Sequence, residues 1–287
     1  MEANTLLNER RLADAWEELH AHANNGNPLL ADSNRMAFAD PEFLFRRETR
    51  GIRFQLEMLK PDLGQTEQGI ENTIVVYGSA RFVAPDEAAQ QLAQARDSGD
   101  PQRVALAERA MRNARYYEQA RQFARLVAEH SNQQEPVNRL YICTGGGPGI
   151  MEAANRGAHD VGALNVGLNI ALPHEQGGNR FITSTLSYKF HYFALRKMHF
   201  LMRAKALVAF PGGFGTLDEL FEVLTLVQTG KTKPVPIVLF GTAFWSRLID
   251  FDLLVEEGTI SPDDLRLFHL TDDPQDAWDR IKTFYRL

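Results

Sequence analysis

The chain has 287 residues, of which 44% are hydrophobic and 24% are charged, and its formal net charge is -6. This composition is typical of a globular protein with enough apolar material for a core. The negative charge excludes a general attraction to nucleic acids or anionic membranes, so any phosphate site has to be built locally.

The first 70 residues are predicted to form an N-terminal helical extension. Helical periodicity runs over residues 11–22 and 41–59, and the second stretch is expected to end at Lys60-Pro61. Four arginines on it form either a phosphate-facing patch or a solvated or subunit-contacting face: Arg46, Arg47, Arg50 and Arg53. Residues 1–16 lack the apolar segment of a signal peptide and no apolar run reaches 18 residues, which predicts a cytoplasmic protein without a membrane partner.

From residue 71 onward, short β-branched runs alternate with helical stretches. Strands are expected over 73–77, 140–143, 166–172, 206–210 and 235–240. Helices are expected over 104–130, 150–161, 189–205 and 216–228 and again near the C-terminus, and 84–101 is expected to be a surface helix and loop. Apolar strands that alternate with helices predict an α/β fold, a Rossmann-like doubly wound parallel sheet with helices on both faces. This nucleotide-binding catalytic domain is predicted to span residues 71–287. The only cysteine, Cys143, is expected to be buried in a strand, and a single thiol suits a reducing compartment.

Small or glycine-rich turns follow three of the predicted strands, at 78–80, 144–149 and 211–216. In an open parallel sheet, ligands bind beyond the carboxyl ends of the strands. Two of these turns open into helices, whose N-terminal N–H groups favour an anion, although a single glycine loop can also be a tight turn. The chain has neither a G-x-G-x-x-G fingerprint nor a P-loop, so we expect a monophosphate site with no cofactor. No His or Cys cluster has metal-ligand spacing, so we expect no metal.

Two charged side chains are candidates for catalysis. Glu219 is predicted in the first turn of helix 216–228, where the helix dipole stabilises an ionised carboxylate. It is either a catalytic carboxylate or a surface residue that only complements the dipole. Arg196 shares one stripe of helix 189–205 with Tyr192, His199 and Arg203. This stripe either binds a phosphate or a ribose, or it is a solvated face of the helix. Apolar residues occupy the opposite arc, among them Phe190, Ala194, Met198, Leu201 and Met202. The expected core face of helix 216–228 is Leu217, Leu220, Phe221, Leu224 and Val227.

Together these stretches resemble the LOG family, the cytokinin-activating phosphoribohydrolases long mislabelled as lysine decarboxylases. The family's P-G-G-x-G-T-x-x-E motif is matched at 211–219, its Arg-Lys pair at 196–197, and its earlier glycine loop at 145–152. The resemblance covers about residues 70–245 and is to the longer bacterial form. No motif for a pyridoxal phosphate lysine supports the decarboxylase label.

The resemblance implies hydrolysis of the N-glycosidic bond of adenine-type nucleoside 5′-monophosphates, AMP and/or cytokinin riboside 5′-monophosphate, to free base and ribose 5-phosphate. It implies a homo-oligomer, a dimer or larger, and catalytic roles for Glu219 and Arg196. The implied substrate-binding residues are Gly78, Ser79, Gly146, Gly147, Met151, Glu152, Lys197, Met198, Gly212, Gly213, Gly215 and Thr216.

Two alternatives stay open at this point. One is a non-catalytic carrier of a phosphorylated ligand, similar to molybdenum-cofactor carriers, and the other is a single-stranded DNA-binding protein similar to DprA. The pairing of a carboxylate with an arginine favours the enzyme, and the net charge of -6 disfavours DNA binding.

Overall fold

The computed structural model describes residues 36–172 and 177–287. The chain comprises two compact units, residues 1–56 and 57–287. The predicted helix over 11–22 lies outside the described residues. In the first unit, the short helix α2 (Pro41–Leu44) is capped by the carboxylate of Asp40. Arg53 donates to the carbonyl oxygens of Leu44 and Arg46, so at least this part of the arginine stretch closes a local turn. The predicted division of the chain at residues 70 and 71 stays a prediction.

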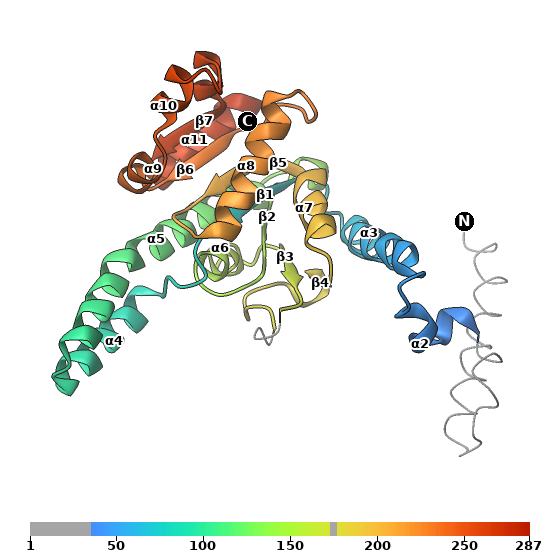
Figure 1. Ribbon diagram of the computed structural model, residues 1–287, viewed down its shortest axis with the longest axis horizontal. Helices are drawn as coiled ribbons and strands as arrows, with labels where there is room; N and C mark the ends of the chain where they lie inside the picture. The colour runs from blue at the N-terminus through green and yellow to red at the C-terminus, as the bar shows by residue number, and fades with distance from the viewer. Residues whose placement is uncertain (1–35, 173–176) are drawn as a thin grey trace. The chain divides into compact units, whose positions relative to one another are not determined.

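In the described part of residues 57–287, seven strands form one parallel sheet in the order β4-β3-β2-β1-β5-β6-β7 (Figure 1). The strands are β1 (Thr73–Tyr77), β2 (Tyr141–Thr144), β3 (Asn165–Ile170), β4 (Ser187–Phe190), β5 (Ala204–Ala209), β6 (Ile237–Phe240) and β7 (Phe268–Thr271). The strand order changes direction between β1 and β5. This arrangement confirms the predicted Rossmann-like α/β sheet, and it makes the carboxyl ends of β1, β2 and β5 the expected ligand edge.

Helices cover both faces of the sheet, as predicted. The longer helices of the described residues are α3 (Arg50–Glu67), α4 (Pro85–Ser98), α5 (Pro101–Asn132), α6 (Ile150–His159), α7 (Phe193–Met202), α8 (Phe214–Gln228), α9 (Thr242–Leu248), α10 (Phe251–Glu256) and α11 (Pro274–Tyr285), and α4 packs on α5. Short 3-10 helices lie at Ala37–Ala39, Pro136–Asn138, Ser184–Leu186 and Pro262–Leu267. Across the described ranges, none of the helices has the length and hydropathy needed to cross a bilayer.

Alternate residues along the strands divide the core in two. Ile74 and Val76 of β1 pack with α5, α6 and α11, whereas Val75 and Tyr77 pack with α7, α8 and Trp245 of α9. Such alternation follows from the pleat of a strand, whose successive side chains point to opposite faces. Cys143 of β2 is 2% exposed, which confirms its expected burial, and this burial raises the pKa of its thiol.

The prediction of one helix over 189–205 is wrong at its start, because β4 occupies Ser187–Phe190 at the edge of the sheet. Burial alternates along β4, with Tyr188 and Phe190 inside and Ser187 and Lys189 outside. This two-residue period is typical of a strand. The segment has only four residues and is followed closely by a helix, so its period is not distinguished from the helical pattern. The strand β7 was also missed, in a region expected to contain only helices.

The predicted end of a helix at Lys60-Pro61 is also wrong, because α3 continues through Pro61 to Glu67. Proline has no N–H, so the carbonyl of Glu57, one turn earlier, loses its helical donor. His199 of α7 replaces that donor, with its Nε2 lying 3.2 Å from the Glu57 oxygen. A carbonyl only accepts, so this nitrogen carries the proton, and burial lowers the pKa of His199 in agreement with a neutral ring. A partner distant in sequence thus keeps the helix intact.

Candidate active site

The structure brings the three predicted loops together through the backbone of Ser79. The Ser79 N–H donates to the carbonyl of Pro211, in the loop after β5, at 3.0 Å. Its own carbonyl accepts from the N–H of Ile150, at the end of the loop after β2, at 3.1 Å. The turns that follow β1, β2 and β5 therefore form one hydrogen-bonded cluster at the carboxyl edge of the sheet.

Close packing explains two of the glycines in this cluster. Gly149 has a φ of 74°, and a Cβ at this position would collide with the backbone carbonyl of Ser79. A Cβ at Gly78 would lie 2.6 Å from the side chain of Ile150. Both glycines hold the loops against one another, so their substitution would disturb the fold itself.

The glycines at the start of α8 lie in a different environment. Gly213, the N-cap, has a φ of -96°, and a Cβ at Gly213 or Gly215 would meet no heavy atom within 4 Å. Neither packing nor backbone angle requires glycine at these two positions. Thr216 is 6% exposed, and a Cβ at Gly212 would collide with its side chain. The open space at Gly213 and Gly215 leaves the backbone N–H groups approachable by a ligand.

Capping distinguishes α8 from several other helices of this unit. Within residues 36–172 and 177–287, no side chain caps the N-termini of α6 or α8, nor those of α4, α7 and α9. By contrast, aspartates cap α5, α10 and α11: Asp100, Asp250 and Asp273. The two helices that begin at the glycine loops thus lack the anionic cap that would compete with a bound anion.

Arg196 and Glu219 form a buried ion pair beside these loops. Arg196 Nη2 lies 2.9 Å from Glu219 Oε1, and the two side chains are 11% and 12% exposed. A Cβ at Gly145 would lie 3.7 Å from Arg196 Nη1, which places the guanidinium next to the loop after β2. Among the described residues, Arg196 Nε has no hydrogen-bond partner. The arginine therefore retains a buried donor for a further acceptor.

The surroundings of Glu219 differ from the prediction. Helix α8 begins at Phe214, so Glu219 lies in its second turn and not in the first. Burial raises the pKa of Glu219 from 4.5 to about 7, and the charge of Arg196 only partly opposes this rise. The carboxyl group is therefore not firmly ionised near neutral pH. It can act as a carboxylate or as a proton donor.

The polar stripe of α7 faces inward, and the solvated alternative is wrong. His199 is 3% exposed, and the Arg203 side chain, at 11% exposed, pairs with Asp62. Met198 and Met202, on the opposite arc, are each 49% exposed. Burial of the charged stripe is possible because each of these polar groups has a partner.

The apolar face predicted for α8 is partly wrong. Phe221 is 39% exposed, whereas the buried residues of this helix are Thr216, Leu220, Val223 and Val227. The buried face of α8 is therefore rotated toward Thr216 relative to the predicted face. Because of this rotation, the Glu219 side chain lies mostly inside the protein.

Other predicted site residues take separate positions. Glu152 accepts a 2.9 Å hydrogen bond from the buried Tyr117 hydroxyl, and a Cβ at Gly147 would lie 2.8 Å from the Met151 methyl group. The Met151 side chain therefore lies at the loop after β2, whereas the Glu152 side chain contacts α5. The Lys197 ammonium instead pairs with Asp218 and Glu222 on α8, and these pairs do not bring it to the glycine loops. Met198 is half exposed to solvent.

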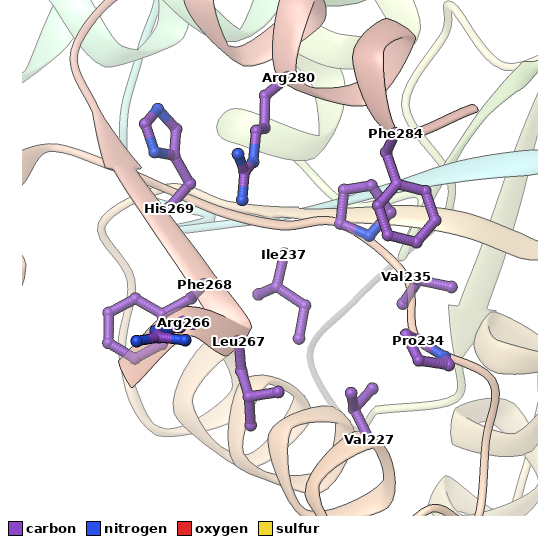
Figure 2. A pocket seen from close by; sticks show the side chains of 11 residues that line it. Val227, Pro234, Val235, Ile237, Arg266, Leu267, Phe268, His269, Arg280 and Phe284 are labelled. Atoms are coloured by element: carbon purple, nitrogen blue, oxygen red, sulfur yellow. The ribbon is translucent and has the colours of Figure 1, made fainter. Parts of the chain in front are cut away.

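A separate pocket, with a volume of about 100 Å³, lies at the opposite end of the sheet (Figure 2). Ile237 and Phe268, the first residues of β6 and β7, line it together with Arg280 and Phe284. It therefore opens at amino ends of strands, away from the glycine loops. In the described ranges, no group of three His, Cys, Asp or Glu side chains is arranged to hold a metal ion.

These features define a Rossmann-like α/β protein with glycine loops and a buried ion pair at the carboxyl edge of its sheet. The family described as "Possible lysine decarboxylase" matches residues 151–281. Cytokinin riboside 5'-monophosphate phosphoribohydrolase LOG3 of Arabidopsis thaliana is 35% identical over 121 residues, 41% of this chain and 55% of that protein. LOG2 of the same plant, which has the same description, is 31% identical over 149 residues, 51% of this chain and 65% of that protein. These matches confirm the predicted resemblance to the LOG family. The chain spans about half the length of the first curated relatives it matches.

Two solved structures show a more distant similarity. The molybdenum cofactor binding protein from Rippkaea orientalis has a TM-score of 0.47 and 17% identity, covering 75% of this chain and 98% of that chain. The Moco carrier protein from Chlamydomonas reinhardtii has a TM-score of 0.40 and 19% identity, covering 76% and 99%.

Proposed function

We propose that this protein hydrolyses the N-glycosidic bond of adenine-type nucleoside 5′-monophosphates, AMP and/or cytokinin riboside 5′-monophosphate. The observation that carries the proposal is the buried Arg196–Glu219 pair next to glycine loops that can hold a phosphate. The names of the curated relatives, cytokinin riboside 5'-monophosphate phosphoribohydrolases, support the same reaction.

In the proposed complex, the substrate phosphate lies at the N-terminus of α8, with the glycine loop 145–147 beside it. The backbone N–H groups near Gly213 and Gly215 donate to its oxygens, and the hydroxyl of Thr216 adds a further contact. Both glycines leave open space for this approach. Because the phosphate is remote from the bond that breaks, its binding energy serves to fix the position of the ribose.

The reaction consumes one water molecule. The bond between C1′ and the base nitrogen breaks and its electron pair stays with the base, while the water oxygen bonds to C1′. The base takes up a proton and the water loses one, which gives free base and ribose 5-phosphate. Positive charge develops on the sugar in the transition state. In its ionised form, Glu219 stabilises this charge or orients the water.

Arg196 is proposed to act with Glu219. Its guanidinium favours the ionised carboxylate, and its free Nε–H offers a hydrogen bond to ribose, phosphate or the leaving base. The rings of Phe193 and Phe200 flank it, with its Cζ 5.1 and 5.5 Å from their centres. These contacts limit the conformations of the arginine, which keeps the donor in one direction.

We also propose a homo-oligomer, as the resemblance implies. On α7, Phe193 is 50% exposed and Met198 and Met202 are each 49% exposed, although they are large and apolar. On α3, Leu59 and Leu63 are 53% and 54% exposed. Contact with a second copy would remove such surfaces from water. A cytoplasmic location likewise stays a prediction.

The test is incubation with AMP and with an isopentenyl-adenine riboside 5′-monophosphate, followed by chromatography for the free base. We expect base release from at least one of them by the wild type and a strong loss in Glu219→Gln. Base release that is absent from both, with tight binding of either nucleotide, would reject the enzyme and favour the non-catalytic carrier. The ratio of the two rates would settle the substrate preference.

A further inference from the structure

A network of buried side-chain amides supports the glycine loop 145–147. Its centre is Asn155 of α6, which is 0% exposed. Asn155 Oδ1 accepts from the Thr144 hydroxyl at 2.7 Å and from Asn179 Nδ2 at 2.9 Å. Asn155 Nδ2 donates to Asn165 Oδ1 at 2.8 Å and to the Val166 carbonyl at 3.3 Å. Both polar atoms of this side chain are thus fully used, which is the condition for a buried amide to be stable.

Asn179 and Thr144 connect this network to the loop. The backbone N–H of Asn179 donates to the Gly146 carbonyl at 2.8 Å, and its Nδ2 lies 3.3 Å from the same oxygen. Asn179 Nδ2 also donates to the Gly147 carbonyl at 3.1 Å. On the other side, the Gly146 N–H donates to Thr144 Oγ1 at 2.9 Å. Asn179 therefore holds the carbonyls of Gly146 and Gly147, and Thr144 holds the N–H of Gly146.

These contacts set the polarity of the loop. In a trans peptide unit, the carbonyl and the following N–H point in opposite directions. Since the Gly146 carbonyl faces Asn179, the Gly147 N–H points away from the network. A loop released from these bonds can turn its carbonyl oxygens toward a bound phosphate, and oxygen atoms with partial negative charge would repel it.

We propose that Thr144, Asn155 and Asn179 are positioning residues that hold the loop 145–147 in the orientation that binds the substrate phosphate. The proposal rests on the proposed function for the identity of the substrate. The phosphate affinity that it predicts is measured without turnover, by calorimetry with ribose 5-phosphate. Loss of the network is expected to change KM and the affinity for ribose 5-phosphate, because the network lies behind the loop and not at the bond that breaks.

Two substitutions remove the support in different ways. Thr144→Val keeps the shape but deletes the hydroxyl, whereas Thr144→Ser keeps the hydroxyl and is expected to bind as the wild type does. Asn179→Ala deletes the side-chain amide that donates to two loop carbonyls and keeps the backbone bond to the Gly146 carbonyl. Asn72→Ala is the matched control, because Asn72 Nδ2 also donates to two backbone carbonyls, of Val137 and Arg139, but just before the amino end of β1.

We expect Thr144→Val and Asn179→Ala to weaken ribose 5-phosphate binding and to raise KM for AMP by about tenfold each, the effect of one or two lost hydrogen bonds. Their kcat at saturating AMP should stay within about threefold of the wild type, and Asn72→Ala should bind normally. An unchanged affinity in both variants, or equal weakening in Asn72→Ala, would overturn the proposal.

The binding measurement separates the two proposals. If the wild type binds ribose 5-phosphate but hydrolyses no nucleotide, the proposed function fails while the affinities of the variants still decide the role of the network. If the wild type does not bind ribose 5-phosphate at all, the positioning proposal is refuted as well.

Discussion

Replacement of Glu219 by glutamine is the most direct test of the proposed catalytic pair. Glutamine has nearly the same shape, and its oxygen can still accept from Arg196 Nη2, which lies 2.9 Å from Glu219 Oε1. Only the charge is removed. If that charge stabilises the developing cation on the sugar, kcat should fall by at least about 100-fold, or ~2.7 kcal/mol. Binding of AMP should change far less, because the interaction matters most in the transition state.

The raised pKa of Glu219 adds a pH dependence with a defined sign. In the folded protein, burial raises the pKa of Glu219 from 4.5 to about 7, so the folded state holds a proton that the unfolded chain releases. The stability that this group contributes is fully present below pH 4.5 and is lost as the pH rises toward about 7. The pKa difference corresponds to about 3 kcal/mol. Relative to Glu219→Gln, the wild type should therefore lose about that much unfolding free energy between these pH values.

Two assays test these expectations together. Urea unfolding of both proteins between pH 4.5 and 8 gives the difference in unfolding free energy, and kcat/KM for AMP over the same range gives the pH profile. A carboxylate role predicts that wild-type kcat/KM rises through pH 7 to a plateau, and a proton-donor role predicts that it falls. Asp218→Asn is the control, because Asp218 is 57% exposed and pairs with Lys197. Wild-type activity in Glu219→Gln would refute the mechanism. An equal loss of kcat in Asp218→Asn would show that Glu219 was wrongly assigned as the catalytic carboxylate.

Three further predictions concern the substrate, the phosphate loop and the assembly. Base release from AMP should be much faster than from adenosine, because the loops are committed to the phosphate, and comparable rates in a chromatographic assay would contradict this. Gly213→Ala and Gly215→Ala should fold normally, since a Cβ at either position meets no heavy atom within 4 Å, yet should reduce the rise in melting temperature caused by AMP. The same rise in the wild type and both variants would place the phosphate elsewhere. Sedimentation should show an oligomer at micromolar concentration, and a monomer would disprove the proposed assembly.

The sequence determined much of the sheet and its ligand edge. Strand β1 has the predicted bounds, Thr73–Tyr77, and the glycine loops follow β1, β2 and β5 as expected. These features are local, because continuous apolar runs define central strands and glycines mark the turns behind them. The match to the LOG motif at 211–219 also singled out Glu219, and the match to its Arg-Lys pair at 196–197 singled out Arg196.

Only the tertiary structure decided which polar groups are buried. Periodicity allowed the stripe with Arg196 and His199 to face solvent, but Arg196 pairs with Glu219, 23 residues away, and His199 contacts the carbonyl of Glu57, 142 residues away. The same contact lets α3 pass through Pro61, against the local rule. Asn155 also lies in a helix whose sequence gives no sign of its partners in three other segments. A polar side chain is buried when distant groups satisfy its hydrogen bonds and charge, and the spacing of residues along one helix does not contain that information.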